Sequence, residues 1–168
     1  LTNMVDDIIT LSNYDSNAVT ITKAPTTTAS ILEAAMQNVT QPLNEAVQLN
    51  LQLDPSYPMV TDADKLSSAL TQIISNAFKF TQTGTITIRV NQTQNPLLTT
   101  FTIEDTGPGI HIPNPDQVFD RFFKVDEYIP GTGLGLSLCR SIITSLGGEV
   151  TVDPTHTTGS RFVVRIGE

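Results

Sequence analysis

The sequence contains no tryptophan and only one cysteine, Cys139, among its 168 residues. A single cysteine excludes an intrachain disulfide, and the sequence has no cysteine and histidine spacing typical of a zinc site. The neighbours Leu138 and Ile142 follow a helical apolar pattern, so we expect Cys139 to be a small core residue. No apolar run reaches the length that a membrane-spanning helix needs.

Charged residues are also scarce, at 15% of the chain, and acidic residues outnumber basic ones by 17 to 9. The net charge of −8 repels phosphate backbones and anionic lipids, which argues against nucleic acids and membrane surfaces as partners. An anionic nucleotide would therefore need local help from helix N-termini, backbone amides or a metal ion. The length indicates one domain with a substantial core.

Apolar periodicity predicts an alternation of helices with strands that are mostly joined as hairpins. The second helix is predicted from Ser30 toward Gln41, because Ser30 and Glu33 have the spacing of a capping box. This order predicts an α+β fold, a two-layer sandwich with the helices on one face of the sheet. Further helices are expected at 1–17, 62–80 and 133–146, and strands at 20–25, 47–53, 85–91, 97–104, 149–153 and 160–166.

The helix predicted at 62–80 carries a polar stripe of Gln72, Asn76 and Lys79, opposite its apolar stripe. Taken alone, such a stripe is most simply the solvent-exposed face of a surface helix. The alternative is a nucleotide site, in which the Asn76 amide oxygen binds Mg²⁺ and Lys79 lies near phosphates.

A carboxylate and two glycines follow the strand predicted at 97–104, in the run Asp105-Thr106-Gly107-Pro108-Gly109. The Asp105 carboxylate is a suitable acceptor for the exocyclic amine of adenine. Gly107 and Gly109 permit close approach of the backbone and unusual dihedral angles. A tight turn after an edge strand is the simpler alternative.

The run Gly131-Thr132-Gly133-Leu134-Gly135 leads directly into an apolar helical pattern. Free amides and the dipole at a helix N-terminus form an anion site suited to a triphosphate. A flexible linker would explain the glycines but not the immediate change to helical periodicity. Upstream, Phe119, Phe122 and Phe123 have helical spacing and are expected to anchor the intervening segment, although core packing also explains any one of them.

These four motifs, in this order, resemble the ATP-binding catalytic domain of sensor histidine kinases. That family shares its fold with gyrase, heat-shock chaperone ATPases and mismatch-repair ATPases, and the fold implies a mixed, mostly antiparallel sheet with three helices on one face. The family pattern Asn-Ala-x-Lys-Phe-Thr is matched from Asn76 through Thr81. The resemblance implies that ATP and Mg²⁺ are the ligands, bound through Gln72, Asn76, Lys79, Phe80, Asp105, Gly107, Gly109, Gly131, Thr132, Gly133, Leu134, Gly135 and Ser160.

Within that set, the resemblance implies that Asn76 binds the metal, that Phe80 lies beside the ribose or base, and that Ser160 supports the adenine site. Gln72 departs from the family, because many histidine kinases have a second asparagine there and the gyrase-type ATPases have a glutamate base. A glutamine cannot act as a base, although its amide oxygen could still reach the metal.

The resemblance also implies which residues take part in catalysis, namely Asn76, Lys79 and Lys124. Lys124, or alternatively Arg121, would balance the charge on the γ-phosphate. The short segment 124–130 implies a small lid.

The implied reaction is in-line transfer of the ATP γ-phosphoryl group to a histidine. His111 and His156 both lie in predicted loops without the family's acceptor motif, so we expect the acceptor upstream and treat both as solvent-facing. Residues 1–17 resemble the end of a dimerisation helix, 18–28 a linker and 29–168 the ATP-binding domain.

The resemblance also implies dimerisation and phosphotransfer helices, a response-regulator receiver domain and a homodimeric parent as partners. It implies a cytoplasmic domain, possibly of a membrane-anchored protein. Two rival functions remain: an ATP-hydrolysing switch, against which Gln72 argues, and a non-catalytic nucleotide-sensing or partner-docking module.

Overall fold

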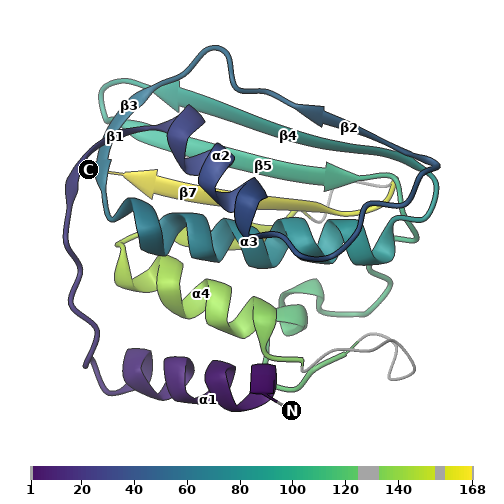
Figure 1. Cartoon of the computed structure of the whole chain (residues 1–168), viewed down its shortest axis with the longest axis horizontal. Helices are drawn as coiled ribbons and strands as arrows, with labels where there is room; N and C mark the ends of the chain where they lie inside the picture. Colours follow the sequence, from purple (N-terminus) through teal and green to yellow (C-terminus); the bar gives the residue numbers. More distant parts are fainter. Residues whose placement is uncertain (1, 125–132, 154–157, 168) are drawn as a thin grey trace.

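The computed structural model describes residues 2–124, 133–153 and 158–167 (Figure 1). Its helices are α1 (Thr2–Asp15), α2 (Thr28–Asn38), α3 (Ala63–Phe80), the 3₁₀ helix η1 (Pro115–Phe119) and α4 (Gly135–Ser145). Its strands are β1 (Ala24–Thr27), β2 (Val47–Leu51), β3 (Pro58–Thr61), β4 (Gly84–Thr93), β5 (Leu98–Asp105), β6 (Glu149–Val152) and β7 (Arg161–Gly167).

The main sheet has five strands in the order β2-β4-β5-β7-β6. β2 is parallel to β4, and the other neighbouring strands are antiparallel. Helices α2, α3 and α4 lie on one face of this sheet, and α1 packs against α4 (Figure 1). The predicted α+β sandwich with three helices on one face of a mixed, mostly antiparallel sheet is therefore confirmed.

Helix α3 lies at the centre of the molecule, between α2 and α4. Asp62 caps its N-terminus, with Oδ1 accepting from the Lys65 amide at 3.3 Å. Its apolar stripe packs against the inner face of the sheet, so its polar stripe is directed away from this core. The core residues of α3 and the facing strands with no more than 1% exposure are Leu66, Ala69, Leu70, Ile73, Ile74, Ile86, Ile88, Phe101, Ile103 and Val164.

Two predictions near the N-terminus were wrong in detail. The strand expected at 20–25 is β1, which begins at Ala24 and pairs with β3, a strand that the sequence did not predict. Helix α2 begins before the expected capping box, because Thr27 ends β1 in an extended conformation and accepts from the Ser30 amide at 3.3 Å.

Helix α4 ends as its sequence indicates, with Gly147 in the left-handed region at φ +80° and its amide donating to Thr144. Cys139 is fully buried within this helix, as predicted, and burial raises the pKa of its thiol to about 12. Among the described helices, none combines the length and the apolar character that crossing a membrane requires.

Candidate nucleotide site

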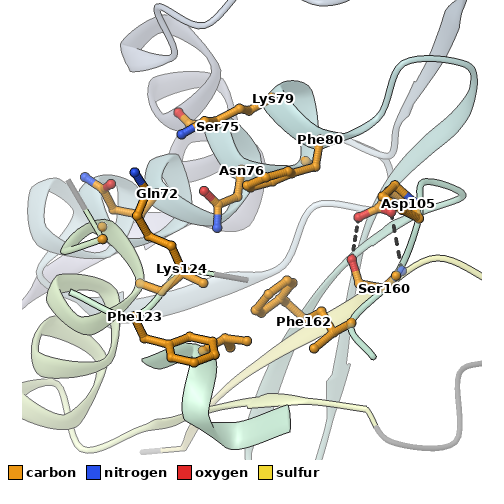
Figure 2. Close-up of a pocket in the computed structure, with 18 of the residues that line it drawn as sticks. Gln72, Ser75, Asn76, Lys79, Phe80, Asp105, Phe123, Lys124, Ser160 and Phe162 are labelled. Carbon is orange, nitrogen blue, oxygen red and sulfur yellow. Dashed lines mark hydrogen bonds between the residues drawn. The ribbon is translucent and has the colours of Figure 1, made fainter. Parts of the chain in front are cut away.

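A cavity of about 510 Å³ lies between the polar stripe of α3, the loop after β5 and the start of α4 (Figure 2). It brings together residues from all four sequence motifs, although these motifs lie far apart along the chain. The expected site residues that line it are Gln72, Asn76, Lys79, Phe80, Asp105, Gly109, Lys124, Gly133, Gly135 and Ser160.

Asp105 lies at one end of the cavity, where β5 terminates, and is 6% exposed. Its Oδ2 accepts from the Ser160 hydroxyl at 2.6 Å (Figure 2). Its Oδ1 accepts from the Gly107 amide at 2.9 Å. The Ser160 amide donates to Oδ1 at 3.3 Å. These donors orient the carboxylate. An amine donor such as that of adenine is a suitable partner for such a group.

Two glycines bring the chain close to Asp105. A Cβ on Gly159 would lie 1.9 Å from the Asp105 carbonyl oxygen, and Gly159 has φ +74°. A Cβ on Gly109, which has φ +80°, would lie 3.0 Å from the Gly159 carbonyl oxygen. Both positions therefore require glycine, because any other residue would combine a strained backbone conformation with a steric clash at this end of the cavity.

The opposite end of the cavity is cationic, with Lys79 from α3 and Lys124 on the far wall (Figure 2). Burial lowers the pKa of Lys79, and the nearby positive charge of Lys124 lowers it further. Neither lysine forms an ion pair with another described residue. Two ammonium groups that repel one another favour an anionic ligand between them.

The first turn of α4 also borders this cationic end, together with Lys79 and Lys124. Leu134 occupies its N-cap position, and an apolar side chain cannot accept from the helix amides. Gly133 and Gly135 line the cavity, so the positive end of the helix dipole faces it. A Cβ on Gly135 would lie 2.8 Å from the Gln72 amide oxygen, which places Gln72 directly against this turn.

Aromatic rings form the middle of the cavity, where Phe162 from β7 lies across from Phe80 (Figure 2). Phe119 of η1 packs edge-on against Phe162, with the ring centroids 6.0 Å apart. The guanidinium carbon of Arg140 lies 4.1 Å above the Phe119 ring, and Arg140 also pairs with Asp116. This stack supports one wall of the cavity from behind.

Several expected residues differ from their predicted placement. Phe122 is 58% exposed and does not anchor the segment between the glycine motifs, whereas Phe119 is buried. Arg121 pairs with Asp15 of α1 and does not line the cavity. The Leu134 side chain is fully buried, and Gly107 lines a neighbouring cavity of about 380 Å³. Gly131, Thr132 and His156 fall outside the described residues.

The cavity also contains residues that sequence reasoning missed, among them Asp7, Gln41 and Phe162. Asp7 and Gln41 come from α1 and from the loop after α2, and no motif marks them. Phe162 could have been found, because it follows Ser160 by two residues and so shares its strand face. His111 is exposed as predicted but also lines the cavity, and its Nε2 donates to the Pro108 carbonyl at 2.5 Å.

The comparisons with known proteins agree with this geometry. Residues 61–168 match the family described as histidine kinase-, DNA gyrase B- and HSP90-like ATPase. The aerobic respiration control sensor protein ArcB of Escherichia coli K12 is 31% identical over 175 residues, which cover 99% of this chain and 22% of ArcB. Hybrid signal transduction histidine kinase D of Dictyostelium discoideum is 38% identical over 124 residues, 68% of this chain and 8% of that protein.

Two solved structures share the fold. The Acinetobacter baumannii histidine kinase AdeS has a TM-score of 0.76 with 23% identity, covering 99% of this chain and 77% of that one. Full-length ShkA in complex with AMPPNP has a TM-score of 0.77 with 23% identity, covering 98% of this chain and 35% of ShkA.

The chain therefore belongs to the histidine kinase-, DNA gyrase B- and HSP90-like ATPase family, and it is the catalytic ATP-binding domain of a sensor histidine kinase. It spans about a fifth of the length of ArcB, of which it covers 22%.

Proposed function

We propose that this domain transfers the γ-phosphoryl group of ATP to a histidine that lies upstream of it. The observation that carries the proposal is the polarity of the cavity. Its Asp105 end offers an oriented carboxylate acceptor, and its other end offers Lys79, Lys124 and the first turn of α4. A molecule with an amine at one end and phosphates at the other fits this arrangement.

Each end then has a definite role in binding. Asp105, supported by Ser160, accepts from the exocyclic amine of adenine, while Phe80 and Phe162 flank the base. Lys79 and the first turn of α4 hold the phosphates, and Lys124 balances the charge that develops at the γ-phosphate. Of the glycine motif 131–135, Gly133 and Gly135 lie at the cavity wall and would admit the phosphates to the helix amides.

The donor set of the cavity fits Mg²⁺ bound together with ATP. The described residues contain no group of three histidine, cysteine, aspartate or glutamate side chains that could hold a metal alone. Mg²⁺ in nucleotide sites takes few protein ligands, and phosphates and waters supply the rest. Asn76, with Gln72 beside it, would contribute neutral amide oxygens, and the ion would neutralise charge on the phosphates.

Positioning and charge neutralisation would provide most of the catalysis. The imidazole nitrogen of the acceptor forms a bond to the γ-phosphorus while the bond from phosphorus to the bridging oxygen breaks. ADP leaves with the electron pair, and the imidazole proton passes to water. No residue of this chain is required as a base, which is consistent with the neutral amide of Gln72 facing the cavity.

We propose that α1 is the end of a dimerisation helix, joined through residues 18–28 to a catalytic domain at 29–168. The other proposed partners are the acceptor helices, a receiver domain and a second copy of the parent, with the catalytic domain in the cytoplasm.

A longer chain that includes the upstream residues tests this function. Incubation with ATP labelled at the γ-position should give an acid-labile, base-stable phosphohistidine, and Asn76→Ala, which removes the proposed metal ligand, should abolish the label. A folded, ATP-binding protein that forms no phosphohistidine would instead favour a nucleotide-sensing or partner-docking module. Steady-state phosphate release without labelled protein would favour an ATP-hydrolysing switch.

A further inference from the structure

The end of the sheet that carries Asp105 and Ser160 is joined by ion pairs on its outer face. Side chains alternate between the two faces of a strand, so Glu104 and Arg161 lie on the face opposite the cavity and the core. These two residues are register partners in the antiparallel pairing of β5 with β7. A polar pair therefore lies on each face at the same point of the sheet.

The Arg161 side chain reaches the ends of both neighbouring strands. Its Nε and Nη2 donate to Glu104 Oε2 at 3.1 and 3.0 Å, and its Nη1 donates to Asp153 Oδ2 at 2.9 Å. The Arg161 carbonyl also accepts from the Asp153 amide at 2.9 Å. One guanidinium thus joins the start of β7 to the end of β5 and to the residue after β6. A lysine ammonium could not reproduce this set of contacts.

The pairs of Arg161 differ from ordinary surface ion pairs. The side chains of Glu104 and Asp153 are only 15% and 23% exposed. Glu104 Oε1 also pairs with Arg89 at 2.6 Å, so these charges form one connected network. Isolated exposed pairs contribute little to stability, whereas several donors on a partly buried carboxylate hold a defined geometry.

Ser160 depends on this network because it directly precedes Arg161 in the chain. Its carbonyl accepts from the Asp105 amide at 2.9 Å, and its hydroxyl donates to the Asp105 carboxylate at 2.6 Å (Figure 2). Hydrogen bonds weaken steeply when donor and acceptor move apart or lose alignment. A start of β7 that is less firmly held against β5 would therefore weaken the contact between Ser160 and Asp105.

We propose that Arg161 is a positioning residue for the adenine base, acting through Ser160 and Asp105 from the opposite face of the sheet. Arg161 holds the start of β7 against the end of β5 and so keeps the Ser160 hydroxyl at the carboxylate. Arg161 does not itself line the cavity. The inference rests on the proposed role of Asp105 in binding ATP.

Arg161→Met and Arg161→Lys test the proposal by calorimetric titration with ADP, inosine diphosphate and inorganic tripolyphosphate, and by thermal unfolding without ligand. Methionine keeps an apolar stem without the charge, and lysine keeps the charge without the planar fork. Inosine diphosphate has a carbonyl in place of the exocyclic amine, so it lacks the donor that we assign to Asp105.

For Arg161→Met we expect roughly fivefold weaker ADP binding, because the hydrogen bond that orients the carboxylate is loosened. The preference for ADP over inosine diphosphate should fall with it, and tripolyphosphate binding should not change. Arg161→Lys should resemble Arg161→Met, and it carries the same test if the methionine variant does not fold.

A double-mutant cycle with Ser160→Ala shows whether Arg161 acts through Ser160. In the Ser160→Ala background, Arg161→Met should cause much less further loss of ADP affinity, because the hydrogen bond that Arg161 positions is already absent. Fully additive losses would mean that Arg161 affects the nucleotide by another route, and they would overturn the proposal.

Arg165→Met is the matched control. Arg165 lies on the same strand and the same outer face as Arg161, where it pairs with Glu149 at 3.5 Å and donates to Thr151 Oγ1 at 3.3 Å. The variant removes the same charge from the same face but leaves the Asp105 end of the sheet intact, so ADP affinity should not change. A long-range effect of charge alone would instead weaken tripolyphosphate binding in both variants and would contradict the positioning role.

Two further results would overturn the proposal. Unchanged ADP affinity in Arg161→Met would show that the network is not needed to position Ser160. Equal losses of affinity for ADP, inosine diphosphate and tripolyphosphate, with a lower unfolding temperature, would make Arg161 a structural residue only. Failure of the unsubstituted chain to bind ADP would contradict the proposed function instead.

Discussion

The carboxylate Oδ2 of Asp105 lies 2.6 Å from the hydroxyl of Ser160, although 55 positions separate the two residues in the sequence. β5 ends at Asp105 and β7 begins directly after Ser160, so the antiparallel pairing of these strands brings the groups together. The sheet register thus determines the orientation of the group that we assign to adenine recognition.

Removing the Ser160 hydroxyl should weaken nucleotide binding. Ser160→Ala deletes a hydrogen bond to an ionised carboxylate, an interaction worth about 1.5–3 kcal/mol, so we expect ADP affinity to fall by about tenfold or more. Isothermal titration with ADP measures the change. Ser145→Ala is the control, because its hydroxyl donates to the Ile142 carbonyl at the far end of α4 and should have no effect on affinity. Unchanged affinity in Ser160→Ala would contradict the assignment.

Replacing Lys124 should relieve charge repulsion in the free domain but weaken nucleotide binding. Its charge lowers the pKa of Lys79, so Lys124→Met removes a repulsion and should raise the pKa of Lys79 toward 10.5. ADP and ATP analogues should nevertheless bind more weakly, because a phosphate partner is lost. NMR titration of the Lys79 side chain and calorimetry check the two effects. Equal loss of stability and affinity would indicate a structural role for Lys124.

The lowered pKa of Lys79 also predicts how stability depends on pH. Between the folded pKa and the ordinary value of 10.5, the unfolded chain binds more protons than the folded one. The stability of the free domain should therefore rise as pH increases through this window. A bound anion that keeps Lys79 protonated should reduce the rise, and denaturant unfolding with and without ADP measures both slopes.

Gly159 should be far less tolerant of substitution than Gly147. Both have positive φ, +74° and +80°, but a Cβ on Gly147 meets nothing within 4 Å, whereas one on Gly159 would lie 1.9 Å from the Asp105 carbonyl oxygen. Gly147→Ala should therefore cost about 1 kcal/mol in unfolding free energy from backbone strain alone. Gly159→Ala should cost several kcal/mol or displace Asp105 and abolish ADP binding. Similar losses in the two variants would refute the close approach.

Arg140 should support the aromatic wall from behind. Arg140→Gln removes both the pairing with Asp116 and the contact with the Phe119 ring, so we expect a loss of about 1 kcal/mol in stability and weaker ADP binding. The hydrogen bond from Arg140 lowers the pKa of Asp116, so this stabilisation is present above pH 3.8 and disappears on acidification below it. Arg165→Gln, which breaks an exposed pair with Glu149, is the control and should leave ADP affinity unchanged.

The central part of the fold could be predicted because its elements have strong local signals. Helix α3 combines an apolar stripe with an N-cap at Asp62, and the hairpin β4–β5 alternates regularly. β3 was missed because it has only four residues and begins with Pro58, and because its pairing with β1 is a tertiary contact. Short strands without a local pattern depend on partners that the sequence does not reveal.

The residues of the candidate site likewise fall into those that a local motif predicts and those that only tertiary packing brings to the cavity. The glycine motifs and the polar stripe of α3, read together with the family resemblance, identified the polar residues and glycines at both ends of the cavity, because the chemistry of a nucleotide requires them at fixed spacing. Asp7 and Gln41 could not be predicted, since α1 and the loop after α2 reach the cavity only through packing. Phe122 was misassigned, because its positive φ of 61° interrupts the helical spacing that would have buried it.

The account depends most directly on adenine recognition by Asp105. Calorimetric titration of this chain with an ATP analogue should show micromolar affinity, a binding free energy of about −8 kcal/mol. The affinity should be higher in the presence of Mg²⁺ than in its absence. Asp105→Asn replaces one carboxylate oxygen with a donor facing the adenine amine and should abolish measurable binding while the domain stays folded. Undiminished binding by that variant, or no binding by the folded parent chain, would contradict the account.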